Sequence, residues 1–428
     1  MTANGANNLD VFFENDLVGQ VFDTSPISFA YAGSWLRTQA LQIANIALAA
    51  GRSDADSVTS FFENLLPEGE LRNYLFAARK ASTLYGLLHA VAGDTAGGFV
   101  LLPTGQTLQP HRYQATSWAQ LSRELRSKAA SAINLKGGGM RISLAGAQDK
   151  VAIALFEDGV PRLGIGTSPS THILKPNIRR IAGVWSSAVN EAVIMKAASR
   201  CGLMAANVFY EPTTRSCVVG RFDDRFIHPD GAVARIMQYD LCQLSSLSSH
   251  KKYEAEGGPN LADCAGLVRK YSTVPALDLK RLLSWVFFNI FTGNNDSHAK
   301  NLSIYSPPGG GVRMTPFYDL MCTRIYPGLS QKFAFSIGGI TIPGAMEMQH
   351  VVAMAEQLNM RAKFVLGLGQ KLAQALPQAM SGAVSALRGV LKRGDVTMAN
   401  RLTKHVEKIT NQAAKPMLGQ PIARNASK

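Results

Sequence analysis

The stretch that decides the fold reads Thr292-Gly-Asn-Asn-Asp296-Ser-His298-Ala-Lys300-Asn301. It follows an apolar run, residues 282–291, and precedes a strand-like run, residues 302–305. Asp296 and Asn301 therefore stand five residues apart on a short polar loop between two elements that read as buried. In a protein kinase, an aspartate in this place takes the proton of the attacking hydroxyl, and the asparagine holds a magnesium ion on the nucleotide phosphates. Because such polar residues are also typical of any turn, the interpretation depends on what surrounds the loop.

The composition is that of a globular protein with a large core. The chain has 428 residues, of which 46% are hydrophobic and 17% charged, so it is long enough for two or three domains. No apolar run reaches the roughly 18 residues that a membrane span needs. Residues 1–10 lack the basic start of a secretory signal. Five cysteines without a C-x-x-C pair favour buried thiols in a reducing compartment over disulfides or a zinc site. We therefore expect a cytoplasmic protein with no membrane partner.

The net charge of +14 is concentrated near the end of the chain. Residues 380–428 carry nine basic and two acidic side chains, which is half of the total excess. A basic face of this kind attracts phosphate backbones or other acidic surfaces. A solvated segment that is basic for solubility explains the same composition equally well.

Sequence patterns divide the chain into three parts. Residues 1–110 form an N-terminal module that opens with a strand hairpin over residues 9–22 and continues with helices. Residues 111–222 begin with a polar helical connector over 111–135, and then read as short strands with one helix. Residues 223–428 are mainly helical. The order predicts an α+β, two-lobed, protein-kinase-like fold, with a nucleotide in the cleft between the β-rich lobe and the helical lobe.

Further residues occur in the order that a phosphoryl-transfer site requires. Gly146 sits in a turn between two strand-like runs, where backbone N–H groups can approach phosphates, and Lys150 follows it. Lys175 ends an apolar strand, from which it can neutralise nucleotide phosphates, and Glu191 on the next helix can hold that lysine. Asp319 then supplies a second carboxylate for magnesium. Alone, each has a commoner explanation as a hairpin turn, a solvent-facing lysine or a helix N-cap, but their order favours a kinase.

The chain resembles the HipA family of bacterial toxins, which are serine/threonine kinases of type II toxin–antitoxin modules. The resemblance spans nearly the whole chain, and its run Asp-x-His-Ala-Lys-Asn is very specific. The motifs that carry it are Ser143-Leu-Ala-Gly-Ala-Gln-Asp-Lys150, Thr171-His-Ile-Leu-Lys175, Arg221-Phe222-Asp223, Tyr253-Glu-Ala-Glu-Gly-Gly-Pro259, Asp296-Ser-His-Ala-Lys-Asn301 and Thr315-Pro-Phe-Tyr-Asp319.

The resemblance implies a role for each matching residue. Asp296 would be the catalytic base, Lys300 would offset charge in the transition state, and Asn301 and Asp319 would hold Mg²⁺. Ser143 matches the serine whose autophosphorylation inactivates the toxin, since a phosphate of about −2 charge there can hold the neighbouring loop out of the ATP site. The residues expected to contact ATP are Ala145, Gly146, Ala147, Gln148, Asp149, Lys150, Lys175, Gly220, Arg221, Phe222, His298, Lys300, Asn301, Tyr318 and Asp319. Gly220 departs from the best-known members, which carry an acidic residue there.

The resemblance also implies partners. They are a small HipB-like helix-turn-helix antitoxin, operator DNA bound through the antitoxin complex, and an aminoacyl-tRNA synthetase as protein substrate, whose phosphorylation arrests growth and supports persistence. The basic segment 380–428 suits the DNA contact. Two alternatives stay open from the residues: a DNA-bound corepressor with a vestigial kinase site, and a kinase for a small molecule.

Overall fold

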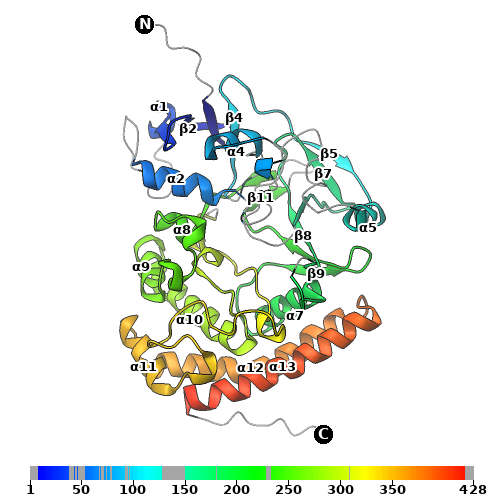
Figure 1. Cartoon of the computed structure of the whole chain (residues 1–428), viewed down its shortest axis with the longest axis vertical. Coiled ribbons are helices and arrows are strands. Elements are labelled where there is room, and N and C mark those ends of the chain that lie inside the picture. The colour runs from blue at the N-terminus through cyan, green and yellow to red at the C-terminus, as the bar shows by residue number, and fades with distance from the viewer. Residues whose placement is uncertain are drawn as a thin grey trace. The chain divides into compact units, whose positions relative to one another are not determined.

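The structure is a computed structural model of the chain (Figure 1). The residues that it describes are 8–37, 43, 46, 54–66, 68, 72–73, 75–77, 80–91, 95, 97–127, 150–179, 181–227, 233–307 and 309–419. It contains both helices and sheets, which confirms the α+β class. The chain forms two compact units. Unit 1 comprises residues 1–175, 220–252 and 305–311, and unit 2 comprises residues 176–219, 253–304 and 312–428. The predicted domain boundaries at 110 and 222 remain predictions.

Unit 1 begins with an antiparallel sheet in the strand order β3-β2-β1-β4, formed by β3 (Ser28–Tyr31), β2 (Asp16–Phe22), β1 (Leu9–Phe13) and β4 (Phe99–Pro103). Glu14 takes the left-handed backbone that the predicted β1–β2 hairpin needs. Helices α1 (Gly33–Arg37), α2 (Ala55–Asn64) and α4 (Leu84–Val91) follow β3 in the chain. Phe61 of α2 packs against Phe99 of the sheet, with ring centroids 5.8 Å apart. Buried aromatic side chains therefore join the helices to one face of the sheet.

The expected helical connector over 111–135 is wrong at its start. Residues Arg112–Ala115 form strand β5, which pairs antiparallel with β7 (Arg162–Ile165). Residues Trp118–Ser127 are helical (α5), and residues 128–135 lie outside the described residues. Strand β5 is only four residues long and mostly exposed, so its sequence gives little sign of a buried face. Its Tyr113 donates to the carbonyl oxygen of Pro169 (2.9 Å) and packs on Phe156. Tertiary pairing thus decides the conformation over local preference.

Strands also continue past residue 223, where the sequence predicted a switch to helices. After β6 (Val151–Ile153), which pairs with β8 (His172–Pro176), unit 1 holds β11 (Asp224–Ile227), β12 (Val233–Arg235) and β13 (Gln238–Asp240) before helix α8 (Leu241–Leu244). Asp223 lies among arginines here: Arg221 donates to it at 2.8 and 2.6 Å, and Arg235 lies 3.7 Å away. All three side chains are buried. Because the pairing lets charged residues enter the interior, hydrophobic patterning gave no sign of these strands.

Unit 2 is mainly helical, as predicted. Figure 1 shows two long helices, α12 (Ala362–Leu387) and α13 (Arg393–Leu418), running side by side, and α7 (Ser187–Arg200) packs against both. Helix α10 (Pro275–Thr292) packs on α12, on α13 and on α9 (Leu261–Tyr271). The remaining elements of unit 2 are β9 (Val208–Glu211), β10 (Ser216–Gly220), β14 (Ser303–Tyr305), β15 (Arg313–Met314), α11 (Met348–Gln357) and the short 3₁₀ helices η2 (Glu254–Glu256), η3 (Ala299–Asn301), η4 (Thr323–Ile325) and η5 (Pro343–Ala345).

Helix α10 is fixed at both ends. At its start, the buried carboxylate of Asp278 accepts hydrogen bonds from Ser272 Oγ (2.7 Å) and Met314 N (2.8 Å) and pairs with Arg281 at 2.8 Å. At its end, Gly293 adopts a left-handed backbone (φ 72°), and a Cβ there would lie only 2.9 Å from Ile409 Cδ1. Glycine is therefore required both by the backbone and by the space. Gly293 therefore ends α10 and fixes where the polar loop begins.

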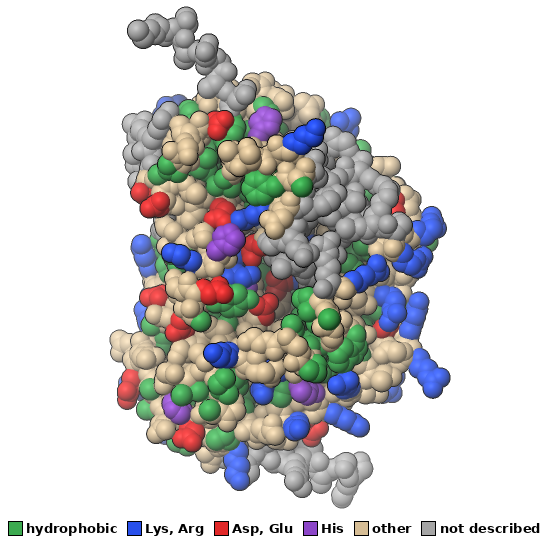
Figure 2. Space-filling view, viewed as in Figure 1, with side chains coloured by type: hydrophobic (Ala, Val, Ile, Leu, Met, Phe, Trp, Pro, Cys, Tyr) green, Lys and Arg blue, Asp and Glu red, His purple; other side chains and the backbone are tan. Residues whose placement is uncertain are grey.

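The surface carries the basic excess seen in the sequence. Lys and Arg side chains gather along the lower right edge in Figure 2, where α12 and α13 lie in the same view of Figure 1. All five cysteines lie in described residues, and none is bonded to another, which confirms that they form no disulfide frame. In the part of the chain that the structure describes, no helix has the length and apolar character needed to cross a membrane.

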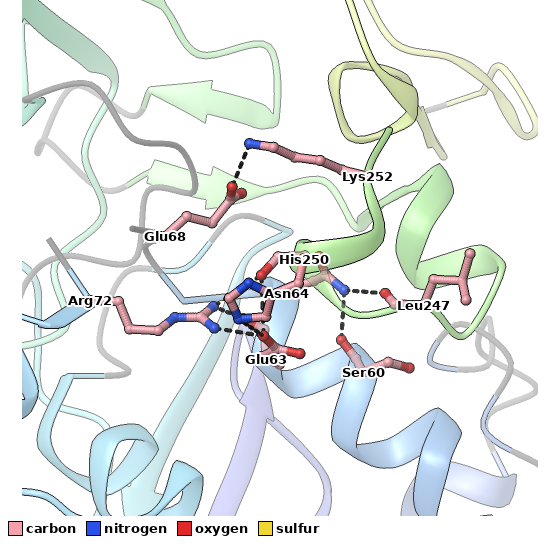
Figure 3. A network of polar contacts seen from close by, with 9 residues as sticks. Ser60, Glu63, Asn64, Glu68, Arg72, Leu247, His250 and Lys252 are labelled. Atoms are coloured by element: carbon pink, nitrogen blue, oxygen red, sulfur yellow. Dashed lines mark hydrogen bonds and ion pairs between the residues drawn. The ribbon is translucent and has the colours of Figure 1, made fainter. Parts of the chain in front are cut away.

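In unit 1, polar contacts fasten α2 to the segment 246–252 (Figure 3). The side-chain nitrogen of Asn64 donates to Leu247 O (2.8 Å), and Ser57 Oγ lies 2.9 Å from Ser246 Oγ. Beside them, Lys252 pairs with Glu68 at 2.7 Å. The N-terminal module therefore holds the segment that leads directly into Tyr253.

Candidate active site

The polar loop after α10 is buried except at one residue. Of residues 291–300, Asp296 alone is exposed, while Asn294 is 1% and Asn295 5% exposed. A surface turn would present most of its side chains to water, so the simple turn explanation does not fit this loop. The fold holds a single carboxylate toward solvent from a buried, hydrogen-bonded support. That arrangement is suited to taking a proton from a bound molecule.

Hydrogen bonds of Asn294, a residue to which the sequence motif assigned no role, hold the polar loop in place. Its side-chain nitrogen donates to Asn289 Oδ1 of α10 (2.8 Å) and, at 3.4 Å, to the carbonyl oxygen of Asp319. Its side-chain oxygen accepts from the backbone N–H of Asp296 (3.3 Å), and its carbonyl oxygen accepts from Ser297 Oγ (3.1 Å). One buried amide thus links the end of α10, the exposed carboxylate and the segment of Asp319.

Asn301 faces the same loop from its other end. Its side-chain nitrogen donates to Asp296 O (2.9 Å), which fixes the amide so that its oxygen points away from that carbonyl. Tyr318 donates to Lys300 O (3.1 Å) and lies 2.8 Å from Ser303 Oγ. The predicted loop residues and Tyr318 are therefore brought together by the fold.

Asp319 adopts a backbone conformation that is rare for aspartate. Its φ is 55°, in the left-handed region, and its carbonyl oxygen is held by Asn294. Non-glycine residues in this region are uncommon, and strained backbone is often found at functional sites. Asp319 is not a helix N-cap, because the helical element that follows it, η4, begins only at Thr323.

Tyr253 contacts the loop directly. Its hydroxyl donates to Asp296 Oδ1, and its ring packs edge-on against His298, with centroids 4.9 Å apart. The next residue, Glu254, accepts from the backbone N–H of Ser336 (2.8 Å), and burial raises the pKa of its carboxyl. Tyr253 belongs to one of the motifs that carried the family resemblance, but nothing in its local sequence indicated contact with a residue 43 positions away.

The predicted residues of unit 1 are mostly buried. Lys150, just before β6, is 6% exposed, and Lys175 in β8 is 2% exposed. Burial lowers the pKa of His172, three residues before Lys175, to about 4, so its imidazole adds no charge near pH 7. Arg221 uses its guanidinium on Asp223, Ser170 Oγ (3.1 Å) and Thr95 O (3.0 Å), so that side chain supports the fold.

Other predicted residues cannot be placed together. Ser143 and residues 145–149 lie outside the described residues. Lys175 belongs to unit 1 and the buried Glu191 to unit 2, so their pairing stays a prediction. Gly220 ends β10, and Phe222 packs edge-on against Tyr305, with centroids 6.1 Å apart. Their contact with adenine likewise remains a prediction.

The donor atoms of the predicted magnesium ligands are of the right kind. Asn301 offers an amide oxygen and Asp319 a carboxylate, and Mg²⁺ prefers such hard oxygen donors. In the described residues, no group of three or more His, Cys, Asp or Glu side chains gathers into a metal cage. Mg²⁺ in phosphoryl-transfer sites commonly uses one or two protein ligands and completes its shell with water and substrate phosphates, so the two residues fit this ion.

Comparisons with known proteins agree over most of the chain. Residues 9–102 match the family described as HipA N-terminal domain, and residues 142–381 match the HipA-like C-terminal domain. The protein Y4mE of Sinorhizobium fredii is 37% identical over 77% of this chain and 80% of its own length. The serine/threonine-protein kinase toxin HipA of Shewanella oneidensis is 26% identical over 89% of this chain and 90% of its own.

The fold also matches a solved structure. It is that of the Shewanella oneidensis toxin–antitoxin system HipA, HipB and its operator DNA complex, with a TM-score of 0.82 and 23% sequence identity. The match covers 97% of this chain and 100% of the solved chain. It confirms the fold that the sequence predicted.

The contact between Tyr253 and Asp296 yields a prediction. Tyr253→Phe removes the hydrogen bond that orients the carboxylate and keeps the ring beside His298. If Asp296 is the base, we expect kcat for phosphoryl transfer to fall about tenfold, because the carboxylate spends less time in the productive orientation. The KM for ATP should stay unchanged.

Tyr271→Phe is the matched control, since Tyr271 lies in α9 of the same unit and beside Lys270. Steady-state kinetics of both variants decide the matter. A Tyr253→Phe enzyme as fast as the wild type, or faster, would show that the phenol does not position the base.

Proposed function

Because the chain belongs to the HipA family, we propose that it is an ATP- and magnesium-dependent serine/threonine protein kinase acting as the toxin of a type II toxin–antitoxin module. One observation carries the proposal. Asp296 is exposed from an otherwise buried loop, and Asn294 ties that loop to the segment of Asp319. A kinase needs this combination of an accessible base and a carboxylate held in a fixed relation to it.

In the proposed reaction, Asp296 accepts the proton of a serine or threonine hydroxyl as that oxygen attacks the γ-phosphorus of ATP. The bond from the γ-phosphorus to the β,γ-bridging oxygen breaks, and ADP leaves with that oxygen. Tyr253 donates to Oδ1 of this carboxylate and so restricts its rotation. Lys300, held through its carbonyl by Tyr318, would offset the charge that develops on the transferred group. The backbone hydrogen bonds of the loop keep these groups in place before the substrate arrives.

Mg²⁺, when bound, would neutralise charge on the nucleotide phosphates. Asn301 and Asp319 are the residues proposed to hold it. The side-chain nitrogen of Asn301 donates to Asp296 O, so its amide oxygen points away from that carbonyl and can serve as a ligand. The left-handed backbone of Asp319 is stabilised by the hydrogen bond from Asn294 to its carbonyl oxygen.

We assign the rest of the ATP site by the family resemblance. Lys150 and Lys175 would contact the phosphates, together with the loop at residues 145–149. Gly220 and Phe222 would line the adenine, with Arg221 contributing its backbone because its guanidinium is used within unit 1. His298 and Tyr318 would flank the nucleotide from the catalytic loop side.

The proposed partners follow the same relatives. The solved Shewanella oneidensis assembly contains HipA, HipB and operator DNA. For this chain we propose a HipB-like helix-turn-helix antitoxin and, through it, operator DNA, with the basic C-terminal segment facing the phosphates. As protein substrate we propose an aminoacyl-tRNA synthetase, whose modification would arrest translation and growth.

The base assignment is tested by Asp296→Asn. The variant keeps the shape of the side chain but cannot accept the proton, so γ-phosphate transfer should fall by about two to four orders of magnitude. Incorporation of labelled γ-phosphate into the chain itself and into purified aminoacyl-tRNA synthetases measures it. Asp23→Asn, which alters an exposed carboxylate of unit 1, is the control. Unchanged transfer by the Asp296 variant would reject the assignment, and transfer absent from both would favour a vestigial site.

The inactivating switch is tested at Ser143. After incubation with ATP and Mg²⁺, mass spectrometry should find phosphate on Ser143, and the Ser143→Ala protein should stay active for longer than the wild type. The reason is that a phosphate of about −2 charge beside the phosphate loop opposes ATP binding. Phosphate found only on other residues would reject this switch.

A further inference from the structure

Three basic side chains form a row on α13. Arg401, His405 and Lys408 are spaced four and three residues apart, so they lie one above another on a single face of the helix. Arg401 and Lys408 are exposed, and His405 is half-buried. Arg401 and Lys408 lie two helical turns apart on this face, with His405 between them. Their like charges, joined by that of His405 when its ring is protonated, repel each other unless a negative partner lies across from the row.

The 3₁₀ helix η4, which packs beside this row, adds a further cation, Arg324. The imidazole of His405 donates to the backbone carbonyl of Arg324, whose side chain is half-buried. Arg401 lies over the ring of Trp185, with Cζ 4.9 Å from the centroid. A Cβ built on Gly293 would lie 3.1 Å from Arg324 Cβ and 2.9 Å from Ile409 Cδ1, so the Arg324 side chain packs where α13 meets the end of α10.

No acidic side chain balances this cluster among the residues that the structure describes. Arg324, Arg401 and Lys408 make no ion pair there. Glu407 on the same helix is exposed and makes none either, and the buried Asp395 is used by Arg215 and Tyr210. Arg324 Nε and His405 Nε2 are buried, and neither has a hydrogen-bond partner among the described residues. Because the other ring nitrogen of His405 donates to Arg324 O, Nε2 becomes a donor only when the ring is protonated. The unsatisfied N–H of Arg324 is costly in a native protein, and a bound anion would supply the acceptor that it lacks.

The pKa shifts of Arg324 and His405 also favour a bound anion in this cluster. Burial lowers the pKa of the Arg324 guanidinium. Burial also lowers the pKa of His405, and the charges of Arg324, Lys408 and Arg401 lower it further. A bound anion would reverse both penalties, because it favours the charged form of each group.

We propose that Arg324, Arg401, His405 and Lys408 form a binding site for a phosphate group carried as a dianion, either free or as a phosphomonoester. A dianion with three acceptor oxygens matches a fork-shaped guanidinium set beside further cations better than a monoanionic carboxylate does. The site does not depend on the proposed kinase activity.

The site adjoins the supports of the polar loop. The backbone N–H of Arg324 donates to Gly293 O (3.0 Å), and its neighbour Thr323 donates to the same oxygen (3.2 Å). Thr323 Oγ1 also accepts from the backbone N–H of Asn295 (2.8 Å). Arg324 and its neighbour Thr323 are therefore hydrogen-bonded to the loop that carries Asp296, so an anion bound at Arg324 would lie close to the supports of that loop.

The test is calorimetric titration of the full chain with inorganic phosphate and with O-phosphoserine, in the presence of saturating non-hydrolysable ATP analogue and Mg²⁺ to occupy any nucleotide site. Arg401→Gln/Lys408→Gln should weaken binding of both ligands about tenfold, since two charge-assisted contacts are lost. Lys363→Gln/Lys371→Gln, which removes two exposed charges from α12 and none from the row on α13, is the matched control and should bind as the wild type does.

Stronger binding of O-phosphoserine than of phosphate would identify a phosphorylated side chain as the source, and equal binding would identify free phosphate. Three results would overturn the proposal: no measurable binding by the wild type, equal losses in both double variants, or binding of duplex DNA but of neither phosphate ligand. None of these outcomes depends on whether γ-phosphate transfer is detected.

Discussion

The rest of the site depends on the hydrogen bonds that the side-chain amide of Asn294 makes. It reaches α10 through Asn289, the loop backbone at Asp296 and the carbonyl oxygen of Asp319. It is almost completely buried, so water does not compete for these bonds. Through this one group, a long packed helix sets the position of the exposed carboxylate and of the strained backbone at Asp319. The site is rigid because its support is part of the core.

Much of this could be predicted from the sequence, and the exceptions have physical causes. The five-residue spacing of Asp296 and Asn301, with Asp319 following, could be read from the sequence because the kinase motif restricts residue type and order. Strand β5 and the strands after residue 223 were missed because they are short and either exposed or ion-paired, so hydrophobic residues do not mark a buried face. The bonds from Asn294 to Asp319 and from Tyr253 to Asp296 were not predicted, because each joins residues far apart along the chain and no local pattern encodes such a contact.

The N-terminal module has a structural role that composition did not reveal. Its helix α2 holds the segment 246–252 by side-chain contacts at Asn64 and Ser57, and Glu68 beyond the helix pairs with Lys252. The chain continues from that segment into Tyr253, which bonds Asp296. A module that resembled an independent domain in sequence therefore anchors one end of a short path that leads, residue by residue, to the exposed carboxylate.

We propose that the Asn294 network holds Asp319 and Asn301 in place as ligands of the Mg²⁺ that accompanies ATP. Calorimetric titration of ATP into the wild type and into folded Asn294→Ala protein, across a series of Mg²⁺ concentrations, is the decisive measurement. We expect Mg²⁺ to tighten ATP binding in the wild type and the variant to need about tenfold more Mg²⁺ for the same effect, since its ligands are no longer held in place. An ATP affinity that does not depend on Mg²⁺ in the wild type, or an identical Mg²⁺ dependence in both proteins, would rule this role out.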